Sequence, residues 1–239
     1  MFMAAPPNEV YPRAPLTEAI FEMRFPGEPS IDCHRDEVFD VVRSWMPVVQ
    51  VPPILDDEAF KFRTYRFASE DDAFTLFVGL NLLAFSSKRY NGFQEFRKQF
   101  LSISEFFIKR FRLSALRRTG LRYVNTIPFT RENGSVPLNR YLNSELKLAP
   151  TLPDGMDVFS FALSTKLPGG TITTRIATIE RDDKKQESIL LDFDYAKVSD
   201  LTSAKIADYL DESHQQTKQF FEGIITPQYR GFIRGTPVT

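Results

Sequence analysis

Hydrophobic and polar side chains alternate along residues 16–25, LTEAIFEMRF, at the period of an extended strand. Successive side chains of a strand point to opposite faces of its sheet, so this segment predicts a half-buried strand. Glu18 and Glu22 would share its outer face with Ile20 and Arg24, while Ala19, Phe21, Met23 and Phe25 would face a core.

The segments that follow predict how the first half of the chain folds. Hydrophobic residues recur at every third or fourth position over 35–46 and, mostly as phenylalanine, over 91–112, so we expect two helices. Residues 60–69 and 73–87 predict two strands that pair as a hairpin, and residues 116–129 predict a closing strand. The order strand, helix, strand, strand, helix, strand is the ferredoxin-like pattern, in which two helices cover one face of an antiparallel sheet.

The second half predicts a related order of elements. A short helix near 138–143 precedes a run of strands joined by hairpin turns, and a long helix follows over 203–223. The predicted strands are 158–165, 171–180 and 187–195. We therefore expect an α+β protein with helices packed on one face of an antiparallel sheet. Residues 1–130 would form a ferredoxin-like half (βαββαβ), and residues 131–239 would form a β-meander with a long C-terminal helix (αβββα), closely packed on the first half as one unit.

Composition narrows the class of protein. The 239 residues include 23 phenylalanines and one tryptophan, which predicts a core built largely from phenylalanine. A formal net charge of −1 removes the whole-molecule electrostatic case for binding nucleic acid or an anionic membrane. One cysteine, Cys33, and two histidines without zinc spacing predict a reducing compartment and no metal site or cofactor. The first residues lack signal-peptide features, and no apolar stretch is long enough to span a membrane, so we expect a cytoplasmic protein.

Four landmarks, in this order along the chain, carry a resemblance to a known family. They are YPRAPLTEAIFEMRF near the start, GLRYVNTIPF, LLDFDY, and His214 followed by Phe220-Phe221-Glu222. Together they resemble a sporadically distributed prokaryotic protein family of about this length. The resemblance carries over no catalytic residue, but a patchy distribution is typical of mobile or defence-associated genes. It implies a protein partner in a defence or toxin-neutralising system.

Positive charge concentrates between residues 88 and 122, where ten basic residues stand against two acidic ones. One hypothesis is a groove that binds phosphate, nucleotide or, through this segment, a nucleic-acid backbone, because arginine forks bind phosphate oxygens in pairs. The residues that would line it are Arg97, Arg118, Arg122 and Asn125, together with Glu18 and Glu22.

A structural alternative explains the same charges without a ligand. Arg118 and Arg122 have the same parity on one predicted strand, so both point to one face of the sheet. In a ferredoxin-like sheet the first and last strands can be neighbours. Ion pairs between Glu18 or Glu22 and Arg122 would then satisfy both signs of charge.

Two further groups are weaker candidates for a site. Asp192 and Asp194 lie two residues apart on one predicted strand face, where two carboxylates can hold a divalent ion or simply form an exposed face. His214 lies beside the hydrophobic stripe of the last helix, a place typical of a packed, hydrogen-bonded histidine. Cys33 and His34 have no third partner that would complete a nucleophilic site.

The sequence contains no complete catalytic set, so we expect a protein that is not an enzyme. The leading hypothesis is a protein-binding module, which the resemblance assigns to a defence or toxin-neutralising system. We expect it to form a homodimer because its long strands leave sheet edges to cover. The alternative hypothesis is a nucleotide- or phosphate-binding enzyme or sensor with a cavity lined by arginine and glutamate.

Overall fold

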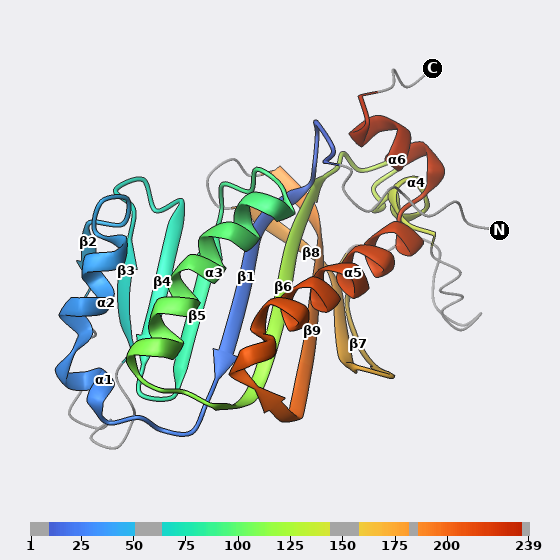
Figure 1. Cartoon of the computed structure of the whole chain (residues 1–239). Coiled ribbons are helices and arrows are strands. Elements are labelled where there is room, and N and C mark those ends of the chain that lie inside the picture. The colour runs from blue at the N-terminus through green and yellow to red at the C-terminus, as the bar shows by residue number, and fades with distance from the viewer. Residues whose placement is uncertain (1–9, 51–63, 144–157, 182–185, 236–239) are drawn as a thin grey trace, which may run out of the picture.

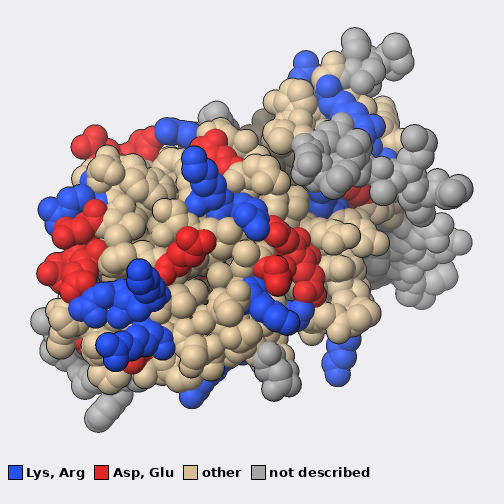
Figure 2. Space-filling view, viewed as in Figure 1, with Lys and Arg blue, Asp and Glu red and all other residues tan. Residues whose placement is uncertain are grey.

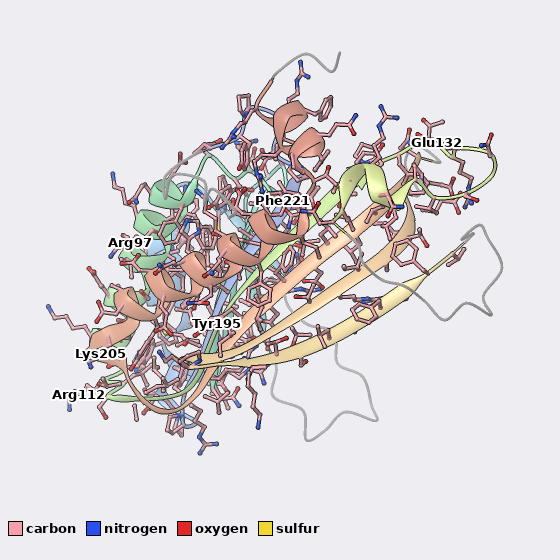
Figure 3. The ribbon with its side chains drawn as sticks, turned by 90° about the vertical axis from the view of Figure 1, so that its right-hand side faces the viewer. Arg97, Arg112, Glu132, Tyr195, Lys205 and Phe221 are labelled. Atoms are coloured by element: carbon pink, nitrogen blue, oxygen red, sulfur yellow. The ribbon has the colours of Figure 1, made fainter. Side chains whose placement is uncertain are left out.

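The computed structural model describes residues 10–50, 64–143, 158–181 and 186–235, and these form one large antiparallel sheet with helices on one side (Figure 1). The nine strands of the described residues are arranged in the order β2-β3-β4-β5-β1-β6-β9-β8-β7. Helices α2, α3 and α5 all lie on the same face (Figures 1 and 3). The α+β class and the large antiparallel sheet are therefore as predicted.

The strands of this sheet vary from three residues at one edge to seventeen near the centre. Their bounds are β1 Leu16–Arg24, β2 Val48–Gln50, β3 Tyr65–Ala68, β4 Phe74–Gly79, β5 Leu82–Ser87, β6 Ala115–Pro128, β7 Ser160–Leu167, β8 Gly170–Arg181 and β9 Gln186–Thr202.

Two long helices, α3 and α5, cover the middle of the sheet. The helices are α1 Ser30–Cys33, α2 Arg35–Val42, α3 Phe93–Arg110, α4 Leu138–Tyr141, α5 Ile206–Ile224 and α6 Pro227–Ile233, and a short 3₁₀ turn, Ser203–Lys205, precedes α5. Helix α6 was not predicted from the sequence, although its start has ordinary signals. The Thr226 side chain accepts a hydrogen bond from the Tyr229 amide, and Pro227 occupies the first turn.

Strand β6 joins the two halves of the chain because it pairs with β1 on one side and with β9 on the other. The first and last strands of the first half are therefore neighbours in the sheet, as predicted. The sheet also runs unbroken across the boundary expected near residue 130. The division into two halves and the ferredoxin-like description of residues 16–129 stay predictions.

One predicted strand was wrong. Residues 73–87 form two strands, β4 and β5, whose register pairs Gly79 with Leu82. Only Leu80 and Asn81 remain for the turn, which is the two-residue connection typical of a hairpin. Glycine followed within two residues by asparagine was the overlooked signal. The short edge strand β2 was also not predicted, and the predicted strand at 60–69 is described only over β3, because residues 60–63 lie outside the described part.

The helix face of the sheet carries two clusters of buried side chains. The first lies under α2 and α3 and is rich in phenylalanine, with Phe21 and Phe100 in edge contact at 4.7 Å between ring centroids. The second lies beneath α5 and α6 and includes Phe193 and Phe221. The alternation read from β1 is confirmed, since Phe21 is fully buried while Glu22 faces the other side of the sheet.

Of the helices in the described part of the chain, none combines the length and the apolar character that crossing a membrane requires.

Candidate functional site

Charged side chains cross the sheet on the face opposite the helices, and we call this row the charged seam: Glu18 and Glu22 of β1, Arg118 and Arg122 of β6, and Asp192 and Asp194 of β9. Arg118 bonds Glu22 through Nη1 at 2.7 Å and Asp194 through Nη2 at 3.1 Å. Gly120 makes this possible, because a Cβ there would lie 2.8 Å from Nη1 of Arg118.

Arg122 binds Asp192 with both arms of its guanidinium, at 2.8 Å from Nε and 2.7 Å from Nη2. The ion pair expected between Arg122 and Glu18 or Glu22 was therefore assigned to the wrong carboxylate. Asp192 lies on β9, the other neighbour of β6, and Glu18 instead accepts a hydrogen bond from the Ser86 hydroxyl. A phosphate ligand would have to displace these carboxylates, and the phosphate-site hypothesis stays a prediction.

Burial of the Asp194 carboxyl raises its pKa, and the nearby guanidinium of Arg118 opposes that shift. Asp192 meets two nitrogens of the Arg122 guanidinium, and Asp194 meets one nitrogen of Arg118, Nη2. Among the residues that the structure describes, no group of three or more histidine, cysteine, aspartate or glutamate side chains is placed to hold a metal ion.

The six residues predicted to line one phosphate groove lie in three different places. Glu18, Glu22, Arg118 and Arg122 belong to the charged seam. Arg97 lies on α3, on the helix side of the sheet, where it binds Asp211 of α5 with both arms at 2.6 and 3.0 Å (Figure 3). Asn125 points to the helix side from β6 and borders a cavity. The predicted set does not form one site.

More than half of the basic side chains of this segment pair with acidic ones, and adjacent blue and red side chains are visible on the helix-covered face (Figure 2). Lys88 and Arg89 bind the acidic turn between β3 and β4, and Arg110 binds Glu37 of α2. With Arg97, Arg118 and Arg122, six of its basic residues have acidic partners. The concentration of positive charge along the sequence is therefore not a concentration in space.

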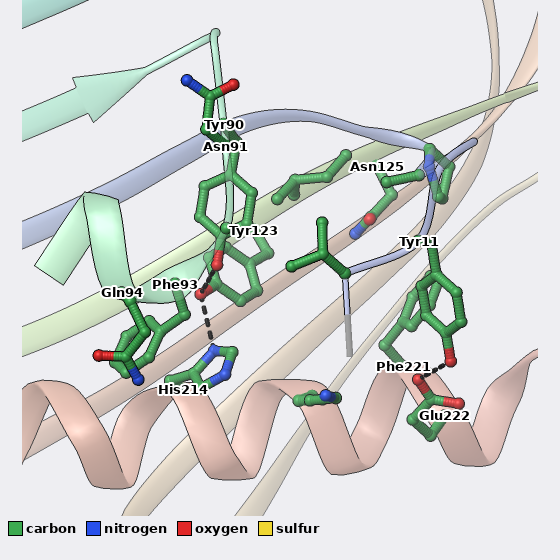
Figure 4. Close-up of a pocket in the computed structure, with 16 residues that line it drawn as sticks. Tyr11, Tyr90, Asn91, Phe93, Gln94, Tyr123, Asn125, His214, Phe221 and Glu222 are labelled. Atoms are coloured by element: carbon green, nitrogen blue, oxygen red, sulfur yellow. Dashed lines mark hydrogen bonds between the residues drawn. The ribbon is translucent and has the colours of Figure 1, made fainter. Parts of the chain in front are cut away.

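A cavity of about 210 Å³ lies on the helix side, between the start of β1, the β5–α3 connection and α5 (Figure 4). Its walls are mostly aromatic and aliphatic, and its polar groups come from four separate stretches of chain. It is lined by Val10, Tyr11, Ala14, Pro15, Leu16, Tyr90, Asn91, Gly92, Phe93, Gln94, Tyr123, Asn125, His214, Lys218, Phe221 and Glu222. Segments distant in sequence thus converge on one partly open cavity.

A chain of three hydrogen-bonded side chains forms one end of the cavity (Figure 4). The hydroxyls of Tyr90 and Tyr123 lie 3.1 Å apart, and the Tyr123 hydroxyl lies 2.9 Å from Nδ1 of His214. Phe93 stacks on the His214 ring at 3.8 Å with the planes 5° apart, which holds the imidazole in place. His214 is packed and hydrogen-bonded, as its position on the last helix predicted.

Both tyrosines of this chain stay neutral at ordinary pH. Burial raises the pKa of Tyr90 to about 12, against a smaller lowering by its hydrogen bond to Tyr123. Burial also raises the pKa of Tyr123 well above its usual value, and Tyr90 adds to that shift. Each hydroxyl therefore serves as a donor and an acceptor of hydrogen bonds and not as a negative charge.

Asn125 contributes an amide to the cavity and is 5% exposed. Its Nδ2 donates to the backbone carbonyl of Leu191 at 3.1 Å. A carbonyl can only accept, so this bond fixes the orientation of the amide. The Oδ1 atom of Asn125 is left as the acceptor that a ligand could use.

The other end of the cavity is built around a buried carboxylate. Glu222 of α5 accepts hydrogen bonds from the Tyr11 hydroxyl and, at 2.9 Å, from Nε of Arg230 on α6. Tyr11 also packs against Phe221 at 6.4 Å between ring centroids. These contacts hold the segment before β1 against α5 and thereby close this side of the cavity.

Comparison with known proteins yields no relative of this chain: no family model, no curated protein and no solved structure matches it. The resemblance read from the four sequence landmarks therefore stays a prediction. Function has to be argued from the geometry of the cavity and of the charged seam.

Most of the cavity residues were missed by the sequence analysis, which had singled out Asn125 and His214 but placed them at different sites. Tyr90 and Tyr123 are 33 residues apart, and His214 is 91 residues beyond Tyr123. Tyr90 stands in no motif, and Tyr123 was noted only as part of the landmark GLRYVNTIPF. The one available signal was that Tyr123 and Asn125 share the inner parity of β6 and are polar in an otherwise hydrophobic row.

Proposed function

We propose that this protein binds a small, flat ligand in the cavity between β6, the β5–α3 connection and α5. The observation that carries the proposal is the convergence of five aromatic side chains and one imidazole with the oriented amide of Asn125 on one partly open cavity. Cavities with mostly apolar walls and a few directed polar groups are the usual form of small-molecule sites. The volume of about 210 Å³ suits a compound of one or two rings.

Binding without chemistry is the simpler function for this site. The described lining includes no serine or cysteine that could serve as a nucleophile. The neutral tyrosines are weak bases, and the Glu222 carboxylate already binds Tyr11 and Arg230. This proposal keeps the expectation that the protein is not an enzyme, and it moves the ligand from the predicted arginine groove to the opposite face of the sheet.

The first test is a ligand-observed NMR screen with a library of one-ring and two-ring compounds. Ala14 is an exposed residue at the border of the cavity, so Ala14→Trp should fill its mouth without removing a polar contact. We expect compounds that bind the wild type to lose their signals with Ala14→Trp. The matched control, Val198→Trp, enlarges an exposed residue on the other face of the sheet and should keep them. Hits that survive Ala14→Trp would refute the proposed site.

A second proposal is the protein binding expected from the sequence, and one feature of the edge strand β7 favours it. Phe161 and Leu163 are 37% and 51% exposed and border a groove of about 570 Å³ beside α5. We propose that β7 pairs with β7 of a second copy. In the antiparallel register centred on Ala162, each Phe161 meets the partner's Leu163, and Lys166 meets no lysine.

This association predicts a dimer that depends on the apolar edge. Sedimentation velocity should show the wild type as a dimer, and Leu163→Lys should shift it to monomer because the substitution sets charges near the two-fold axis. Val198→Lys, an equally drastic change at an exposed residue away from the edge, should leave the dimer intact. A wild type that stays monomeric at every concentration would exclude this interface. The defence setting implied by the resemblance stays a prediction.

A further inference from the structure

The polar groups of the cavity restrict the chemistry of the ligand beyond its size. Asn125 offers its Oδ1 as an acceptor, since its Nδ2 is engaged by the Leu191 carbonyl. A buried amide oxygen that met only hydrocarbon would lose its hydration without replacement. The ligand should therefore carry an N–H or O–H donor that reaches this oxygen.

The Tyr90–Tyr123–His214 chain adds a second polar contact whose direction can reverse. When Nδ1 of His214 accepts from Tyr123, Tyr123 accepts from Tyr90, and the Tyr90 oxygen is left as an acceptor. When Nδ1 carries a proton and donates to Tyr123, Tyr123 donates to Tyr90, and the Tyr90 hydroxyl is free to donate to a ligand. Because both tyrosines stay neutral, either direction is available at ordinary pH.

The aromatic side chains form two groups at the two ends of the cavity (Figure 4). At one end Tyr90 meets Tyr123 edge-on at 5.7 Å, beside the stacked rings of Phe93 and His214. At the other end stand Tyr11 and Phe221. Flat rings gain both stacking and edge contacts between such groups, whereas an aliphatic chain would gain only burial. A charged compound would also leave water to meet mostly apolar walls.

We propose that the ligand is a nitrogen heteroaromatic ring with a donor beside an acceptor on its edge, which is the pattern of a nucleobase. The ring stacks between the two aromatic groups, its N–H donates to Oδ1 of Asn125, and its neighbouring nitrogen or carbonyl accepts from the Tyr90 hydroxyl. Bound ligand therefore selects the direction in which His214 donates to Tyr123. This inference rests on the proposed small-molecule site and specifies which class of molecule fills it.

The volume of the cavity limits the size of the heteroaromatic ligand. A pocket for a drug-sized ligand is typically about 300–1,000 Å³. The cavity of about 210 Å³ is smaller. It takes the ring of a free base, while the sugar and phosphates of a nucleotide would have to project out of it.

The test compares nucleobases with a flat ring compound that has no hydrogen-bond acceptor beside its N–H donor. Isothermal titration of the full chain would use adenine, hypoxanthine, cytosine and uracil as probes, with indole as the comparison compound. A site built to hydrogen-bond its ligand rejects analogues that leave buried polar groups unpaired, so we expect at least one base to bind more than about 100-fold more tightly than indole.

Two variants test whether Tyr90 and Asn125 recognise the base. Tyr90→Phe removes the hydroxyl but keeps the ring, and it should weaken binding of the base about tenfold while leaving indole unchanged. Asn125→Leu removes the Oδ1 acceptor and should weaken binding of the base, with circular dichroism used to check that the variant folds. Tyr90→Phe keeps the inference testable if Asn125→Leu does not fold.

The possible failures are distinguishable. If indole binds as well as every base, and Ala14→Trp abolishes both, the small-molecule site stands and the nucleobase class is overturned. The same class is overturned if a base binds tightly but Tyr90→Phe and Asn125→Leu both leave its affinity unchanged. If bases bind and Ala14→Trp has no effect, the proposed site itself fails. If no base binds at the solubility limit, the nucleobase inference is wrong, and the NMR screen decides the site separately.

Discussion

Replacing Glu222 with alanine will lower the free energy of unfolding by about 3 kcal/mol, because it leaves the Arg230 guanidinium buried without its carboxylate. The two side chains are only 10% and 16% exposed, and Nε of Arg230 lies 2.9 Å from Oε2 of Glu222. The Tyr11 hydroxyl loses the same acceptor. One compensation survives, since Arg230 also donates to the backbone carbonyl of Glu222, so we place the effect at the lower end of the range for broken buried pairs.

Urea unfolding of four variants measures this effect and separates its parts. The comparison of Glu222→Ala, Arg230→Ala and the double variant should give a positive coupling energy, with the double variant less destabilised than the sum of the single ones. The matched control is Glu132→Ala, which removes a carboxylate from an ion pair of 50% and 59% exposed side chains and should cost less than about 1 kcal/mol. An equal loss from Glu132→Ala and Glu222→Ala would contradict the argument from burial.

Glu222 also connects stability with the proposed site. It holds Tyr11, and Tyr11 belongs to the segment that closes one side of the cavity. Backbone contact between Arg13 and Ile233 fixes the same segment to α6. Loss of the carboxylate should therefore weaken ligand binding as well as folding, although Glu222 does not belong to the hydrogen-bond set proposed to recognise the ligand edge.

The parts of the fold that were predicted follow from local periods in the sequence. Alternation along β1 predicted that Glu22 faces away from the core, and the spacing on β6 predicted that Arg118 and Arg122 share one face. Helical spacing of phenylalanine predicted α3. These patterns are short-range, because they reflect which face of one element is buried.

The partner of Arg122 could not be obtained in that way. Asp192 is 70 residues further along the chain, and its contact with Arg122 depends on β9 pairing with β6 in one register. A different neighbour for β6 would have left Glu18 as the nearest carboxylate. Long-range pairing is a property of the whole sheet, so no local pattern distinguishes these alternatives.

The candidate site was even less accessible from sequence. Charge is conspicuous in a sequence, and attention went to the basic segment, whose members turn out to bind acidic side chains of other elements. The cavity instead depends on neutral tyrosines and an amide, whose importance comes from burial. Burial of Tyr90 and Tyr123 is known only once α3 and α5 are placed over the sheet.

Replacing Phe100 with alanine will lower the free energy of unfolding by about 3–5 kcal/mol, the largest loss that we expect from a single side chain of α3. Phe100 is fully buried and contacts Phe21 of β1 edge-on at 4.7 Å, so the truncation removes both hydrophobic burial and an aromatic pair. It also leaves a cavity between the helix and the centre of the sheet, which cannot collapse without moving α3.

The control for this prediction lies on the same helix. Phe106→Ala removes the same atoms from a position that is only partly buried, so urea unfolding should show about half the loss or less. A double-mutant cycle of Phe100→Leu with Phe21→Leu should add a coupling of about 0.5–1.5 kcal/mol for the ring pair. Equal losses from Phe100→Ala and Phe106→Ala would show that the contact between α3 and β1 does not hold the helix. Because Phe93 at the start of α3 stacks on His214, a shifted helix should also disturb the cavity, and Phe100→Ala should weaken ligand binding more than Phe106→Ala does.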